Sequence, residues 1–206
     1  MTQYKLTYFD VDGGRAESIR LAFHLGNIPF EDERWSFADF GAKRAGLRFA
    51  CVPVMTIDGA EVTQSNALNR YVGRLAGLYP EDALQALYCD ELMDAVEDIG
   101  NHVGRTFGMK GEALREAREA LAAGPLKQFM VGLDALLTRG GGEYFADGRL
   151  TVADLKVVVQ VRALLKGVLD HIPPTFVAEL APNLARHCER VSADSRIVAY
   201  YAARKK

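Results

Sequence analysis

Two short motifs, one predicted β-hairpin apart, are of types and spacing that could together hold a small peptide. Val52-Pro53 begins an apolar, β-branched run that predicts a strand. Asp58-Gly59 then predicts a two-residue turn, because both central residues of such a turn need positive φ. After a short returning strand, Gln64-Ser65 opens a segment whose apolar residues recur at helical spacing, which predicts a helix.

Each motif would offer main-chain groups to a ligand. A proline at the start of a strand cannot donate to the sheet ladder, and a cis bond before Pro53 would turn the N–H and C=O of Val52 outward, toward an extended peptide. The helix N-terminus at Gln64-Ser65 favours a carboxylate through its unpaired N–H groups and its dipole. Taken separately, a proline that ends a loop and a serine that caps a helix are the simpler interpretations. Taken together, the two motifs predict a peptide site.

A strand is predicted over residues 4–9, from the alternation of Tyr4, Leu6 and Tyr8 with the residues between them. Tyr8 lies near the carboxyl end of this strand, where α/β sheets usually bind ligands. Pattern alone favours a packed core aromatic at Tyr8, and we interpret Tyr4 on the same face as structural.

These segments resemble the cytosolic glutathione S-transferases, in particular the tyrosine-type, sigma-like branch. The glutathione-binding half of that family is similar to Val52-Pro53 with Gln64-Ser65, and its beginning is similar to residues 4–9 followed by residues 14–17. Residues 151–154, Thr-Val-Ala-Asp, extend the resemblance into the second half, so that it covers the whole chain.

The resemblance implies that Tyr8 is the catalytic residue and that glutathione is the co-substrate. A free thiol has a pKa of about 8.5 and is only a few per cent ionised at neutral pH. One hydrogen bond to a charged group contributes roughly 1.5–3 kcal/mol, which corresponds to about one to two pKa units. One phenol that donates to the sulfur is therefore enough to make the thiolate the main species near pH 7.

The resemblance also implies the glutathione-binding residues. Arg15 would brace the pocket, although the loop before it is one residue longer than in the sigma-like pattern. The main chain of Val52, beside Pro53, would pair with the cysteinyl part of glutathione. Gln64 and Ser65 would hold the γ-glutamyl carboxylate and amine.

Three further residues of this implied site lie between the second and third predicted strands. Phe40 stands near a position where the family usually has tryptophan, so it keeps an apolar wall and loses an indole donor. Either Lys43 or Arg44 would pair with the glycyl carboxylate, and the sequence leaves both open. Cys51 stands where a lysine is common, and a small buried thiol is the simpler interpretation of it.

The order of the predicted elements gives the fold class. Residues 1–77 are predicted to form a thioredoxin-like α/β domain that binds glutathione, with strand, helix, three strands and helix in order. Gly77 to Pro80 is the predicted linker, and residues 82–206 are predicted to form an all-helical C-terminal domain.

In the helical half we predict helices from Leu84 to Phe107, from Glu112 to Leu137 with a break at Gly124-Pro125, and from Thr151 to Leu169. Thr151 to Asp154 has the spacing of a capping box. The acids of the first long helix are interpreted as a solvated or interface face, and Asp98 stays a candidate to reach glutathione on a neighbouring subunit. The other acids of this face are Asp94 and Glu97.

Composition excludes several functional classes. The net charge is −2 with both signs scattered, which argues against a nucleic-acid partner. We expect no apolar run to reach the ~20 residues that a membrane span needs. The three cysteines form no CxxC, so neither a zinc site nor a redox pair is indicated, and we expect no metal cofactor. A cytoplasmic, reducing setting is expected.

The predicted function is conjugation of the glutathione thiolate to hydrophobic electrophiles in detoxification, with hydroperoxide reduction as an added activity, carried out by a homodimer. Two alternatives stay open. One is a glutathione-dependent isomerase of the prostaglandin type on the same scaffold, and the other is a non-enzymatic structural protein that kept the fold.

Overall fold

The computed structural model describes residues 2–204, which divide into two compact units. The first unit ends at Tyr79, and the second begins at Pro80. Each unit is described by itself below.

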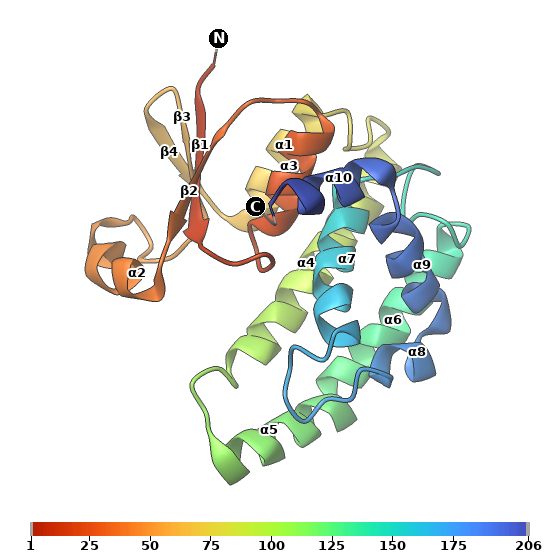
Figure 1. Ribbon diagram of the computed structural model, residues 1–206. Coiled ribbons are helices and arrows are strands. Elements are labelled where there is room, and N and C mark those ends of the chain that lie inside the picture. Colours follow the sequence, from red (N-terminus) through yellow and green to blue (C-terminus); the bar gives the residue numbers. More distant parts are fainter. Residues whose placement is uncertain (1, 205–206) are drawn as a thin grey trace. The chain divides into compact units, whose positions relative to one another are not determined.

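A mixed four-stranded sheet is the centre of the first unit (Figure 1). Its strands are β1 (Tyr4–Phe9), β2 (Glu31–Trp35), β3 (Val54–Ile57) and β4 (Ala60–Thr63). The spatial order is β2-β1-β3-β4, with β1 and β2 parallel and the other two pairs antiparallel. The charged strand β2 lies at an edge of the sheet, where charged side chains hinder pairing with another chain.

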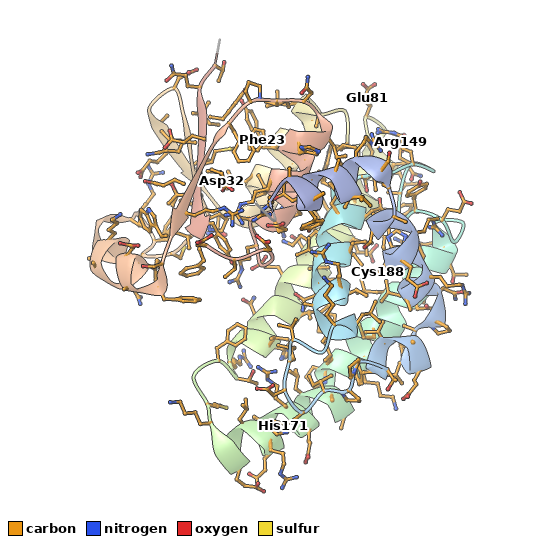
Figure 2. All side chains as sticks on the ribbon, viewed as in Figure 1. Phe23, Asp32, Glu81, Arg149, His171 and Cys188 are labelled. Carbon is orange, nitrogen blue, oxygen red and sulfur yellow. The ribbon has the colours of Figure 1, made fainter. Side chains whose placement is uncertain are left out.

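Two helices, α1 (Glu17–Leu25) and α3 (Ser65–Leu75), lie side by side and pack on this sheet (Figure 1). Ile19 and Phe23 of α1 and Leu68 and Val72 of α3 are fully buried. Phe23, labelled in Figure 2, contacts the rings of Tyr4 and Phe30. The helix α2 (Phe37–Lys43) and the 3₁₀ turn η1 (Arg44–Gly46) follow β2 and lie apart from that pair. The mixed sheet with covering helices confirms the predicted α/β class.

The turn between β3 and β4 has the predicted conformation. Asp58 has φ +48° and Gly59 has φ +89°, so both central residues take the left-handed region that the Asp-Gly pair favours. The turn fixes the pairing of Ile57 with Ala60, and thereby the register of the hairpin.

The second unit is all-helical, which confirms the predicted C-terminal fold. Its helices are α4 (Ala83–Gly104), α5 (Gly111–Ala123), α6 (Pro125–Arg139), α7 (Val152–Leu165), α8 (Phe176–Leu180), α9 (Pro182–Ser192) and α10 (Ser195–Ala203). The apolar helix α7 lies between α4 and α9 (Figure 1), and most of its side chains are buried. It ends four residues earlier than predicted, because Gly167 takes φ +65° and turns the chain away from the helix.

We expected no apolar run long enough to span a membrane, but the stretch Gly111–Arg139 is long and apolar enough by length and composition alone. Of its most apolar window, 28% is buried. The stretch comprises α5 and α6, and Gly124 breaks the helical backbone between them with φ −110° and ψ −110°. A span needs about 20 residues, which neither the 13 residues of α5 nor the 15 of α6 provide.

The predicted capping box at the start of α7 is present and fully buried. Asp154 Oδ2 accepts hydrogen bonds from the Thr151 N–H at 2.8 Å and from the Thr151 hydroxyl at 2.7 Å. Asp154 Oδ1 accepts a further bond from the Phe145 N–H at 3.2 Å. One carboxylate therefore joins the helix start to the loop before it.

Asp154 also lies against His187 of α9. Both side chains are fully buried, and His187 Nε2 is 3.4 Å from Asp154 Oδ1. Burial raises the pKa of Asp154 to about 6 and lowers the pKa of His187 to about 4. At pH 5 the unfolded chain holds one proton on the histidine and the folded chain holds one on the aspartic acid. Because the number of bound protons is the same, this pair makes stability nearly independent of pH there.

Single substitutions should separate the contributions of Asp154 and His187 to the pH dependence of stability, which oppose each other. In Asp154→Asn only His187 titrates, and its lowered pKa gives a contribution that is present above pH 6.5 and lost as pH falls toward 4. In His187→Gln only Asp154 titrates, and its raised pKa gives a contribution that is present below pH 3.8 and lost as pH rises through 6. Urea unfolding near pH 5 should give slopes of opposite sign, each approaching about 1.4 kcal/mol per pH unit. Slopes of the same sign would contradict this account.

Candidate functional site

The strand register brings three of the predicted site residues to one end of the sheet. Three neighbouring strands, β1, β3 and β4, pair through Thr7, Val54 and Thr63. Tyr8 follows Thr7, Pro53 precedes Val54, and Gln64 follows Thr63. These three residues therefore lie side by side across this end of the sheet. Residues from three separate segments thus share the edge formed by the carboxyl ends of β1 and β4.

Tyr8 is held by the loop that follows β1. Its side chain is 6% exposed, and its hydroxyl oxygen accepts a hydrogen bond from the Arg15 N–H at 3.1 Å. Gly14 has φ +68°, and a Cβ at this position would lie 2.6 Å from the same oxygen, so only glycine fits. A hydroxyl that accepts one hydrogen bond is polarised to donate another, which suits a phenol that stabilises an anion.

Arg15 thus reaches Tyr8 through its main chain. Its side chain is half-buried at the end of the loop, two residues before α1 begins. The loop is one residue longer than in the sigma-like pattern, and it still brings the Arg15 N–H to the phenol.

The peptide bond between Val52 and Pro53 is cis. Val52 is 7% exposed, and both residues precede β3, whose first paired residue is Val54. The neighbouring Cys51 is exposed, so its interpretation as a small buried thiol is wrong. Pro53 has no N–H to donate, so the ladder of β3 begins at Val54.

Gln64 has a backbone conformation that is rare outside glycine. Its φ is +76° and its ψ is 106°, and it occupies the N-cap position of α3 without a capping hydrogen bond from its side chain. Ser65 is the first helical residue, 6% exposed, so it does not cap the helix as the simpler interpretation had it. Strained backbone of this kind persists mainly at functional sites, where the surrounding structure holds it.

Phe9 joins Tyr8 to an aromatic group on α2. The ring of Phe9 lies 5.1 Å from that of Tyr8, 4.9 Å from that of Phe37 and 5.0 Å from that of Phe40. The ring of Phe9 therefore lies between Phe40 and Tyr8. Phe37, which is 72% exposed, was not among the predicted site residues.

Lys43 of α2 and Arg44 of η1, the two candidates for the glycyl carboxylate, make cation–π contacts with different aromatic rings. The Arg44 guanidinium lies 5.4 Å from the centre of the Phe40 ring, and Lys43 Nζ lies 4.8 Å from the centre of the Trp35 ring. Lys43 also faces Glu33, whose pKa is lowered chiefly by its hydrogen bond from Thr7, with Lys43 adding a smaller electrostatic contribution.

The acids of α4 divide into two kinds. Glu97 was interpreted as solvated or interfacial, but its carboxylate pairs with Lys156 Nζ of α7 at 2.9 Å, and Lys156 is almost completely buried. Asp94 and Asp98 are exposed.

The helical unit also contains a cavity of about 360 Å³, lined by Tyr88, Arg139 and Phe145 among others, and none of the predicted site residues lines it. Among residues 2–204, no group of three or more His, Cys, Asp or Glu is arranged to hold a metal ion.

One structurally important residue was missed by the sequence analysis. Arg20 lies on the buried stripe of α1, four residues after Ala16 and three before Phe23, and its side chain is fully buried. The spacing places this arginine within an otherwise apolar stripe, and that position alone could have indicated a buried, paired guanidinium.

A small mixed sheet with covering helices, followed by an all-helical unit, is the fold of a thioredoxin-like protein with a helical C-terminal domain. A family model described as "Glutathione S-transferase, C-terminal domain" matches residues 97–204. Glutathione S-transferase 3 of Caenorhabditis elegans is 32% identical over 174 residues, covering 82% of this chain and 84% of the relative. The chain therefore belongs to the glutathione S-transferase family.

Two further comparisons extend over nearly the whole chain. Hematopoietic prostaglandin D synthase of Gallus gallus is 29% identical over 207 residues, covering 100% of this chain and 98% of the relative. Among solved structures, a monomeric glutathione S-transferase of the hookworm Necator americanus aligns with a TM-score of 0.85 at 25% identity, covering 98% of this chain and 97% of the other.

Proposed function

We propose that the protein is a sigma-like glutathione transferase that conjugates the glutathione thiolate to hydrophobic electrophiles. The observation that carries this proposal is the register of Tyr8, Pro53 and Gln64 at one end of the sheet, with the Tyr8 hydroxyl oriented by the Arg15 N–H. Family membership supplies the co-substrate, and this arrangement supplies a phenol beside a place for a tripeptide.

In the proposed complex, the glutathione backbone lies along the main chain of Val52, just beyond the paired residues of β3. Its γ-glutamyl carboxylate rests on the N-terminus of α3, next to Gln64 and Ser65, where the helix dipole favours negative charge. No acidic residue stands in the first turn of α3 to oppose this. The Arg15 side chain braces the pocket.

The Tyr8 hydroxyl then donates to the cysteinyl sulfur and stabilises the thiolate, and the proton of the thiol passes to solvent. A hydrogen bond to a charged group is worth roughly 1.5–3 kcal/mol, sufficient to lower the pKa of the thiol by about one to two units. The thiolate attacks an electrophilic carbon, the carbon–sulfur bond forms, and the leaving group departs with its electron pair.

Arg44 is the cation that we propose for the glycyl carboxylate. It lies on Phe40, which contacts Phe9 beside Tyr8, whereas Lys43 lies on Trp35 and faces the acid Glu33. Arg44→Ala should raise the KM for glutathione about 10-fold with little change in kcat, because the contact is the same in the ground and transition states. The measurement is steady-state kinetics with glutathione varied. A larger increase in KM for Lys43→Ala than for Arg44→Ala would reverse the assignment.

A conjugation assay tests the proposed function. The full chain is mixed with glutathione and 1-chloro-2,4-dinitrobenzene, a general aromatic electrophile, and the thioether is followed by its absorbance. We expect turnover that saturates in glutathione and needs the protein. Binding to a glutathione column without turnover toward several electrophile classes would support the structural-protein alternative instead.

A glutathione-dependent isomerase is the second candidate, favoured by the full-length likeness to the Gallus gallus protein named as a prostaglandin D synthase. It shares the thiolate with the first candidate and differs in regenerating glutathione. Product analysis separates the two: an isomerase consumes no net glutathione, whereas a transferase consumes one per product.

We also propose a homodimer in the cytoplasm, with a role in detoxification and an added hydroperoxide reductase activity. Leu84 and Leu87 of α4 are 51% and 61% exposed on one face of that helix, an apolar surface that a second copy would cover. Light scattering coupled to gel filtration should give twice the 22.6 kDa chain mass. A mass of one chain would place the protein with the monomeric hookworm relative.

A further inference from the structure

Arg20 makes an unusually complete set of contacts in the first unit. Its Nε donates to Asp32 Oδ1 at 2.9 Å, and its Nη1 donates to the Glu17 carboxylate at 3.2 Å. The same guanidinium reaches two main-chain oxygens, those of Val11 at 3.0 Å and Phe9 at 3.4 Å. Asp32, labelled in Figure 2 on β2, thus joins this strand to α1 through Arg20.

The guanidinium end of these contacts is closed to water. The Arg20 and Glu17 side chains are fully buried, and the Asp32 side chain is 27% exposed. A buried guanidinium is stable only when its donors are used, and four hydrogen bonds use most of the five. Arg34 lies outside this group, with its Nε 2.8 Å from the second oxygen of Asp32, and its Nη1 also pairs with Asp10 at 3.2 Å and with Asp12 at 3.5 Å.

The two carbonyls that Arg20 holds begin the loop around Tyr8. Phe9 directly follows Tyr8, and Val11 lies two residues further on. The other end of the same loop is Gly14, whose main chain approaches the phenol, and Arg15, whose N–H donates to it. Arg20 therefore fixes the start of a loop whose end orients the hydroxyl.

The guanidinium also lies beside the phenol ring itself. The Arg20 Cζ is 5.8 Å from the centre of the Tyr8 ring, within the range of a cation–π contact, and both side chains are buried. Tyr8 is thus held at two places, at its ring by the Arg20 side chain and at its oxygen by the loop.

We infer that Arg20 is a positioning residue for the reaction, one that acts through Tyr8 by fixing the loop from Phe9 to Arg15. The inference rests on the proposed function, since it assumes that Tyr8 donates to the glutathione sulfur. A displacement of about 1 Å is enough to weaken such a contact strongly. Arginine is required because a lysine has no planar fork to hold a carboxylate and two carbonyls together.

The test measures the pKa of the thiol of bound glutathione from the thiolate absorbance near 240 nm, in wild type and in variants of the full chain. Arg20→Met is made together with Glu17→Gln, so that no unpaired charge is left buried. We expect the pKa of the bound thiol to rise by about half to one unit and kcat/KM at pH 6.5 to fall about 10-fold. The Kd of glutathione should change less than about threefold, because the main-chain and helix contacts proposed for the peptide, at Val52, Gln64 and Ser65, are not among the contacts of Arg20.

Three controls make the result specific. Glu17→Gln alone measures the effect of the acid. Arg118→Met removes a different buried arginine, 5% exposed and bonded to Thr106 in the helical unit, and should lower stability without moving the thiol pKa. Arg20→Lys keeps the charge in case the methionine variant does not fold, and should shift the thiol pKa in the same direction by a smaller amount.

A double-mutant cycle with Tyr8→Phe decides whether Arg20 acts through the phenol. In the Tyr8→Phe background, the Arg20 substitution should leave the thiol pKa unchanged, because the group it positions is gone. An equal shift in both backgrounds, or no shift in either Arg20 variant, would overturn the inference. If wild type itself does not lower the thiol pKa, the proposed function fails, which is a distinguishable result.

Discussion

Tyr8→Phe should lower kcat with 1-chloro-2,4-dinitrobenzene about 10²-fold while leaving the Kd of glutathione nearly unchanged. The phenol is proposed to donate one hydrogen bond to an anion, and losing a bond to a charged group costs roughly 1.5–3 kcal/mol. The ring of Tyr8 is buried and contacts Phe9, and phenylalanine keeps both features. The loss is therefore confined to the hydroxyl, and steady-state kinetics with isothermal calorimetry for glutathione separates turnover from binding.

Tyr4→Phe is the matched control. Tyr4 is on the same face of β1, and its hydroxyl lies 3.4 Å from that of Tyr71 at the other end of the strand. Removing this hydroxyl should leave kcat within about twofold. Full activity in Tyr8→Phe, or equal losses in the two variants, would show that Tyr8 does not stabilise the thiolate.

Asp154→Ala should lower the melting temperature by about 10 °C. Its carboxylate accepts from the Thr151 N–H, the Thr151 hydroxyl and the Phe145 N–H, and all these groups are buried. Leaving such donors without an acceptor costs about 3–5 kcal/mol in total, and each kcal/mol lowers the melting temperature of a chain of this size by about 2–4 °C. Scanning calorimetry at pH 7 measures the effect.

The exposed capping box of α2 provides the control for burial. Ser36 and Asp39 make the same reciprocal bonds at the start of that helix, and both residues are exposed. Water can replace the lost carboxylate there, so Asp39→Ala should shift the melting temperature far less than Asp154→Ala. Equal shifts would mean that burial does not set the cost of losing the box.

Local signals in the sequence were enough for most of the sheet unit. The alternation in residues 4–9, the Asp58-Gly59 turn and the apolar stripe of α3 each depend on neighbours in the chain, and the structure has all three. The hairpin then determines that Pro53 and Gln64 lie across from each other, which is why a site could be predicted from two motifs.

What the sequence did not indicate depends on contacts between distant segments. The pairing of Glu97 with Lys156 joins α4 to α7, and neither helix alone shows that its charged residue is half-buried or buried. Arg20 is held by Asp32, twelve residues away on β2, and by carbonyls of a loop whose path cannot be derived from spacing. The positive φ of Gln64 is likewise imposed by the surrounding fold, since a glutamine does not favour it.

The most direct measurement of the central claim is a pH titration of glutathione bound to the wild-type protein, followed by the thiolate absorbance near 240 nm. The account predicts an apparent pKa of the bound thiol about one to two units below the value of about 8.5 for a free thiol, with this shift largely absent in Tyr8→Phe. A bound thiol that titrates at the value of the free one in wild type, or equally low in both proteins, would contradict it.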